Sequence, residues 1–175
     1  MSSTLQVMHV IEFSLKMRKQ FFKDAIVNND LEMLEFLLEI GYECEYPDII
    51  NVCQYGGSVN ALKLFIAHGG GNQVLNLPNG RTQEDNIPIL MKLILTAAVS
   101  FTNLEIVEYI LSLKVIPLVA SIAHNAIRCC DLIMVECLLK HGVPIDNTSI
   151  FLAYAIKGKN TSDYYEMMDI ICPFM

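Results

Sequence analysis

Hydrophobic and polar residues follow one another along this chain in a short pattern that returns several times. In the first four copies, apolar residues fill the columns headed by Leu31, Leu34, Leu37 and Leu38. The spacing i, i+3, i+6, i+7 places these columns on one face of an α-helix. The copies are NDLEMLEFLLEIG (29–41), GSVNALKLFIAHG (57–69), TNLEIVEYILSLK (102–114), CDLIMVECLLKHG (130–142) and, more weakly, SDYYEMMDIICPF (162–174).

A second apolar pattern precedes each copy and predicts a second helix. Its first, second, fifth and sixth columns are nearly always apolar, and its fifth column holds only Ala or Cys: Ala25, Cys53, Ala98, Ala126 and Ala155. A column of small side chains indicates close approach to a neighbouring helix. The copies are FFKDAIVN (21–28), IINVCQYG (49–56), ILTAAVSF (94–101), IAHNAIRC (122–129) and FLAYAIKG (151–158).

The second helix of each pair carries its own start and stop residues. Asp or Asn stands where an N-cap belongs, and Gly stands where a helix ends in a left-handed residue. The predicted caps are Asp30, Asn103 and Asp131, and the predicted ends are Gly41, Gly69 and Gly142. The first four copies are spaced by 28, 45 and 28 residues, and the interval of 45 residues contains an insertion.

Regular helix pairs at this spacing predict an all-α solenoid, because one pair cannot bury its own apolar stripe and a stack of pairs can. We expect one domain over 1–175, made of about five degenerate helix pairs with an N-terminal capping helix at Leu5–Lys19. The predicted repeats are approximately 17–45, 46–70, 88–115, 118–144 and 148–175, with a loop insertion at 70–88.

Three segments follow the pattern D-L-E-x-[VL]-x-x-L-L-x-x-G most closely, namely Asp30–Gly41, Asn103–Lys114 and Asp131–Gly142. In these motifs, and over about residues 17–175, the chain resembles the ankyrin-repeat family. It lacks the Thr-Pro-Leu-His opening of that family, and its units are shorter than the usual repeat of about 33 residues. Shortened repeats of this kind are similar to those of large DNA viruses and some intracellular pathogens. That resemblance implies a partner among host defence or ubiquitin-pathway proteins.

The charge of the chain is concentrated in one segment. The net charge is −7, and Asp30 to Asp48 contains seven acidic residues and no Lys or Arg. The remainder is balanced and has no basic stripe, so a nucleic-acid partner is not expected. No apolar stretch reaches the roughly 18 residues of a membrane span, and no export signal is recognisable. Six cysteines without framework spacing favour reduced thiols and a cytoplasmic location.

Two clusters contain residue types that occur in catalytic or metal sites. The HGGG at 68–71 can supply oxyanion-hole amides, but no G-x-S-x-G nucleophile elbow accompanies it, so a hydrolase or small-ligand site there is the weakest alternative. The second cluster lacks the paired short spacings of a zinc site. Its members are His124, Cys129, Cys130, Cys137 and His141. We predict no enzyme activity, metal or cofactor.

Partner contacts are expected from positions that helix packing leaves open. The acidic, tyrosine-containing loop at 41–48 is either a binding surface for a basic protein or peptide or an ordinary solvated loop. The insertion at 70–88 is either functional or disordered. Two inner-helix columns vary freely, one containing Tyr55 and Arg128, the other Tyr154. The predicted partner-binding residues are Tyr42, Glu43, Glu45, Tyr46, Asp48, Tyr55, Arg81, Arg128 and Tyr154.

The last helix pair ends in apolar residues, although a terminal repeat normally turns a polar face to water. We therefore expect either that the tail folds back or that a homodimer forms through the C-terminal end. The predicted self-association residues are Ile170, Ile171, Phe174 and Met175. The favoured function is a non-catalytic protein–protein interaction module, and the alternative is a structural or self-assembling particle component.

Overall fold

The structure is a computed structural model in which residues 16–68, 83–157 and 161–175 are described. All regular secondary structure in these residues is helical, which confirms the all-α prediction. The chain divides into two compact units, Met1–Asn79 and Gly80–Met175, here named the N-terminal unit and the C-terminal unit. The division falls within the insertion that the sequence predicts at 70–88.

The N-terminal unit is built from short helices around an aromatic and aliphatic core. A helix at residues 16–27 is followed by α2 (Leu31–Glu39), α3 (Tyr46–Gln54) and α4 (Val59–Ala67), and α4 contacts both α2 and α3. Phe22 and Phe65 are buried together, edge to face, with their ring centroids 5.2 Å apart.

The boundary between the predicted capping helix Leu5–Lys19 and the next helix is wrong. Residues 16–27 form one uninterrupted helix, so the chain does not break after Lys19. Residues 16–27 contain no Pro or Gly to interrupt the helix, which buries Phe22, Ala25 and Ile26 at the spacing i, i+3, i+4. Residues 5–15 lie outside the described part of the chain.

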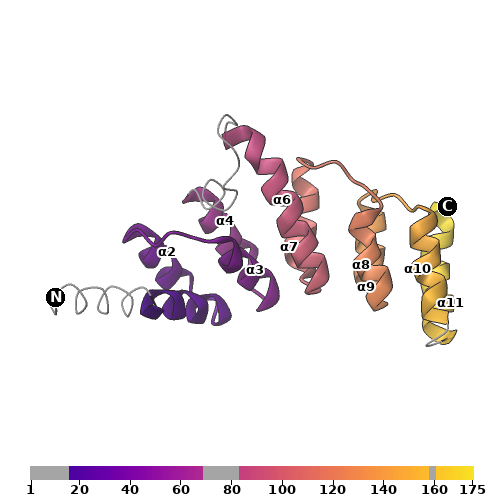
Figure 1. Ribbon diagram of the computed structural model, residues 1–175, viewed down its shortest axis with the longest axis horizontal. Helices are drawn as coiled ribbons and strands as arrows, with labels where there is room; N and C mark the ends of the chain where they lie inside the picture. The colour runs from indigo at the N-terminus through magenta and orange to yellow at the C-terminus, as the bar shows by residue number, and fades with distance from the viewer. Residues whose placement is uncertain (1–15, 69–82, 158–160) are drawn as a thin grey trace, which may run out of the picture. The chain divides into compact units, whose positions relative to one another are not determined.

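The C-terminal unit consists of three successive helix pairs (Figure 1). The first helices of the pairs contact one another in order, α6 with α8 and α8 with α10, and the second helices do likewise, α7 with α9 and α9 with α11. Each pair therefore packs on the next through both of its helices. The bounds are α6 Gln83–Ser100, α7 Leu104–Leu113, α8 Ser121–Cys129, α9 Leu132–Lys140, α10 Asn147–Lys157, α11 Thr161–Ile171 and the 3₁₀ turn η1 Cys172–Phe174.

The helix α6 begins earlier than the sequence predicts. Residues 83–88, assigned to the loop insertion, are helical, and Pro88 lies inside the helix. Leu90, Met91, Ile94 and Leu95 are all buried, so the apolar stripe of α6 extends toward its N-terminus beyond the aligned pattern at 94–101. The rest of the insertion, 69–82, lies outside the described residues.

The predicted helix starts are confirmed. The side chains of Asp30, Asn103 and Asp131 each accept a hydrogen bond from the backbone N–H three residues ahead, at 3.0 Å, 3.2 Å and 3.1 Å. Each cap satisfies one of the N–H groups that the first turn of a helix leaves without a partner.

The predicted helix ends are confirmed where the structure describes them. Gly41 and Gly142 have φ of +84° and +85°, in the left-handed region, and Gly69 lies outside the described residues. Lys114 takes the glycine position in its copy and is left-handed as well, with φ of 55°. A side chain with a Cβ thus adopts the conformation that the repeat demands.

In three of the helix pairs, a left-handed residue stands immediately before the cap of the second helix. Asn29, Thr102 and Cys130 occupy this position with φ of 52°, 57° and 58°. The N–H of the following cap then bonds to the carbonyl of the small column, as in Asn103 to Ala98 at 2.9 Å. The small side chain and the left-handed residue therefore belong to one turn, which three copies share.

Candidate interaction surfaces

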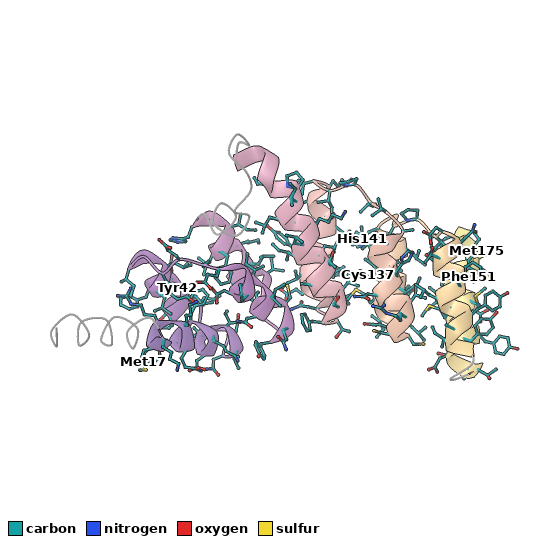
Figure 2. All side chains as sticks on the ribbon, viewed as in Figure 1. Met17, Tyr42, Cys137, His141, Phe151 and Met175 are labelled. Carbon is teal, nitrogen blue, oxygen red and sulfur yellow. The ribbon has the colours of Figure 1, made fainter. Side chains whose placement is uncertain are left out.

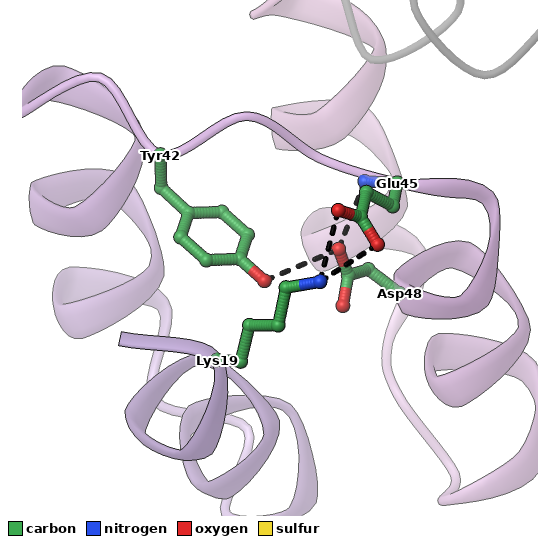
Figure 3. A network of polar contacts seen from close by, with 4 residues as sticks. All are labelled: Lys19, Tyr42, Glu45 and Asp48. Atoms are coloured by element: carbon green, nitrogen blue, oxygen red, sulfur yellow. Dashed lines mark hydrogen bonds and ion pairs between the residues drawn. The ribbon is translucent and has the colours of Figure 1, made fainter. Parts of the chain in front are cut away.

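A cluster of polar side chains joins the helix at 16–27 to the start of α3 (Figure 3). Asp48 is only 8% exposed, and its carboxylate accepts hydrogen bonds from the Glu45 backbone N–H at 2.9 Å and from the Tyr42 hydroxyl at 3.3 Å. The Tyr42 ring stacks on Phe22 with centroids 4.2 Å apart. Burial raises the pKa of Asp48 and, more strongly, the pKa of Tyr42.

This geometry corrects the expected partner-binding loop at 41–48. Tyr42 and Asp48 are buried and hydrogen-bonded to each other, so neither offers the exposed surface that the sequence suggested. Glu45 pairs with Lys19 at 2.9 Å, with both side chains about half exposed, and Glu43 is exposed. The side chain of Tyr46 lies outside the described part. The loop mainly stabilises the N-terminal unit, because its Asp48 caps the N-terminus of α3 as part of a capping box.

The helix α2 carries two apolar stripes. Leu34, Leu37 and Leu38 are buried, as the sequence predicts. Met33, Phe36 and Ile40 form a second stripe at the spacing i, i+3, i+7, and are 40%, 54% and 45% exposed. Sequence reasoning missed this second stripe, because the Met33 column is apolar in all of the first four copies and gives no sign that it is exposed in one of them. Its residues in the next three copies are buried: Ala61, Ile106 and Met134.

An aromatic surface lies on α10 and α11. Phe151 is 73% exposed, and Figure 2 shows it at this end of the C-terminal unit together with Met175. Tyr154 and Tyr165 are also exposed and flank the buried Tyr164, at centroid distances of 5.5 Å and 5.3 Å. The sequence predicts Tyr154 as a partner-binding residue, and it does not predict Phe151 or Tyr165.

The fifth copy of the first-helix pattern buries only part of the predicted set of columns. Ala155 is exposed, although its equivalents Ala25, Cys53, Ala98 and Ala126 are buried. Instead α10 buries Ser149, Ala153 and Ile156. Two columns that α6 and α8 bury are therefore exposed in α10, at Phe151 and Ala155, whereas Ile156 keeps the buried sixth column.

The predicted self-association residues do not share one environment. Ile171 is fully buried within the unit and Ile170 is partly buried, so these two side chains largely complete the last helix pair. Phe174 and Met175 are exposed. The helical end of the tail is thus buried within the last helix pair, and its last residues are exposed. Homodimer formation through the C-terminal end stays a prediction.

The two variable columns differ in exposure. Tyr55 and Arg128 are exposed, as expected; the Lys23 ammonium lies 4.9 Å from the centre of the Tyr55 ring, and Arg128 donates a hydrogen bond to Asn125. In the other column Val52 is fully buried, so that column is not a continuous exposed surface. Arg81 lies outside the described residues.

The Cys137–His141 pair has the spacing of a catalytic dyad but lacks its electrostatics. The two side chains are 3.8 Å apart, between Sγ and Nδ1, and Nδ1 also lies 2.9 Å from the Cys137 carbonyl oxygen (Figure 2). Burial raises the pKa of the Cys137 thiol, which keeps it protonated and weakens it as a nucleophile. Across the described residues, no three His, Cys, Asp or Glu side chains gather in a metal-binding arrangement. No helix there is long and apolar enough to span a membrane.

No protein-family profile, curated protein or solved structure matches this chain. The α2 stripe and the α10–α11 aromatic surface each group several exposed large apolar side chains on packed helices.

Proposed function

We propose that this chain is a non-catalytic protein-interaction module built as an ankyrin-like solenoid of helix pairs. The observation that carries the proposal is the exposed aromatic surface of Phe151, Tyr154 and Tyr165 on packed helices. Aromatic side chains are enriched at the centres of protein interfaces, where a few of them supply most of the binding free energy. In support of the repeat architecture, three copies share the same cap and the same left-handed turn.

The scaffold favours binding because its surface is already ordered. Tyr164 is buried beneath the exposed pair Tyr154 and Tyr165 and contacts both rings, which restricts their rotamers. Tyrosine has only two side-chain torsions to fix, so little conformational entropy is lost when a partner covers it. The partner class suggested by the resemblance to shortened viral repeats is a host defence or ubiquitin-pathway protein in the host cytoplasm.

Site-specific photo-crosslinking tests this function. Benzoyl-phenylalanine in place of Tyr154 puts an aromatic crosslinker on the proposed surface, and the same group in place of the exposed Lys92 of α6 is the control. We expect a covalent adduct with a second protein from position 154 and none from position 92. Equal products from both positions, or none from position 154, would contradict a binding role for this surface.

A self-assembling subunit is the second candidate, favoured by the outward face of α10. Phe151 and Ala155 occupy columns whose residues are buried in α6 and α8, so a second copy could cover them as a helix pair covers the equivalent residues within the chain. Light scattering at high micromolar concentration should then give the mass of a dimer, and Phe151→Ser should return it to a monomer. A monomer for the unchanged chain rejects this candidate and leaves the first one intact.

A further inference from the structure

We infer that the exposed face of α2 is a separate docking surface that takes a basic amphipathic helix of a partner protein. This inference goes beyond the proposed function, because the surface belongs to the N-terminal unit and shares no residue with the aromatic surface on α10 and α11. It stands on two observations: an apolar stripe that the fold leaves exposed, and a row of carboxylates beside it.

The apolar stripe is not needed for the packing of α2 itself. Leu34, Leu37 and Leu38 already bury one side of the helix. Met33, Phe36 and Ile40 lie on another side, and each keeps at least 40% of its surface exposed. Three adjacent large apolar side chains on one helix face are typical of a surface that another molecule covers.

The carboxylates occupy one edge of this stripe. Helical geometry places Glu32, Glu39 and Glu35 in that order around the helix, starting from Phe36. All three are exposed, and α2 has no basic residue in its last turn. Lys63 of α4 lines the same shallow depression, of about 380 Å³, as Glu35. We therefore place the cations of the partner opposite Glu32 and Glu39, farther from Lys63.

These two features together define the partner chemistry. The apolar row from Met33 to Ile40 covers seven residue steps, about 10 Å along a helix at about 1.5 Å per step, which matches two turns of a partner helix. Such a helix would carry apolar residues at i, i+3 or i+4, and i+7, with Lys or Arg on the adjoining edge. The acidic edge disfavours nucleic acid and anionic lipid, because both would be repelled.

A designed peptide pair tests the inference with the full chain. The probe is a fluorescent peptide of about 14 residues made of Leu and Lys, with the leucines at helical spacing. The matched control peptide has the same composition with the leucines alternating, so that a helix of it has no apolar face. Fluorescence anisotropy at low and at physiological salt measures the dissociation constants.

We expect the helical peptide to bind at least about tenfold more tightly than its isomer, and its affinity to fall as the salt concentration rises. The single variant Phe36→Ser should lower the affinity for the helical peptide about tenfold or more, and so should the double variant Glu32→Gln with Glu39→Gln. The control variant Phe151→Ser should leave it unchanged. These side chains are exposed, and unchanged circular dichroism would show that the variants fold.

Equal binding of the two peptides, no binding of either, or full binding to Phe36→Ser would overturn the inference. None of these outcomes bears on crosslinking at Tyr154, which tests the α10–α11 surface. Failure of the α2 surface and failure of the proposed function are therefore distinguishable.

Discussion

Replacement of Thr102 by Gly should stabilise the protein. Thr102 lies between α6 and α7 with φ of 57°, and a β-branched side chain is rarely found in this left-handed region. The residue is exposed, so the change removes little buried contact. In the equivalent turn of the N-terminal unit the position is Asn29, a residue type that tolerates this conformation far better.

The expected gain follows from two opposing terms. The left-handed conformation costs an L-residue roughly 1–2 kcal/mol, and glycine avoids that cost. Glycine in turn loses about 0.5–1 kcal/mol more conformational entropy on folding. We expect a net stabilisation of about 0.5–1 kcal/mol, which for a unit of about 100 residues raises the Tm by roughly 2–8 °C.

Urea unfolding and thermal melting, both followed by circular dichroism, measure the effect. Thr102→Ala retains a Cβ and therefore the strain, so it should raise the free energy of unfolding less than Thr102→Gly does. Thr102→Asn should give a value between those of the Ala and Gly variants. Thr96→Gly, within α6, is the matched control and should destabilise by some tenths to about 1 kcal/mol. A Thr102→Gly protein no more stable than Thr102→Ala would refute the left-handed assignment.

Three further predictions concern caps, thiols and pH. Asp131→Ala should lower the free energy of unfolding by about 1 kcal/mol in urea titration, and Asp131→Asn should restore most of it, because Asn also accepts from the N–H of the first turn. Burial raises the pKa of Cys53 to about 12, so its alkylation at pH 8 should lag far behind that of the exposed Cys129, as mass mapping would show. The backbone N–H of Ser149, first among several hydrogen-bonding causes, lowers the pKa of Asp146 from 3.8 to about 2. That contribution is complete above pH 3.8 and lost toward pH 2, so acid titrations of stability should be flatter for Asp146→Asn.

Local rules explain what the sequence could predict. An Asp or Asn before an apolar stripe and a Gly after it determine helix ends within a few residues, and Asp131 and Gly142 follow that rule. The stripe of Leu34, Leu37 and Leu38 is buried for the same reason that it is visible in sequence, since one helical face must leave water.

Features that depend on neighbours in space were not predictable. An acidic tyrosine-containing loop resembles a binding surface, and only the packing of Tyr42 against Phe22 makes it an internal cluster. The register of α10 likewise depends on which helices lie beside it, so Ala155 fits the pattern of small residues and is nevertheless exposed. The sequence columns indicate which residues can be buried, and the packing of neighbouring helices determines which of them are buried.

The two proposed surfaces share one physical origin. Met33 lies in α2, the second helix of the first described pair, and Phe151 lies in α10, the first helix of the last described pair. Both occupy columns whose residues are buried in the copies between these two pairs. A partner that covers either surface therefore supplies burial that another helix pair supplies elsewhere. Without a partner, Met33→Ser should change the free energy of unfolding by no more than about 0.5 kcal/mol. The same change at the fully buried Ile106, in the same column, should cost roughly 3 kcal/mol or more. Similar losses at the two positions, measured by urea unfolding, would show that the Met33 face is part of the core and is closed to a partner.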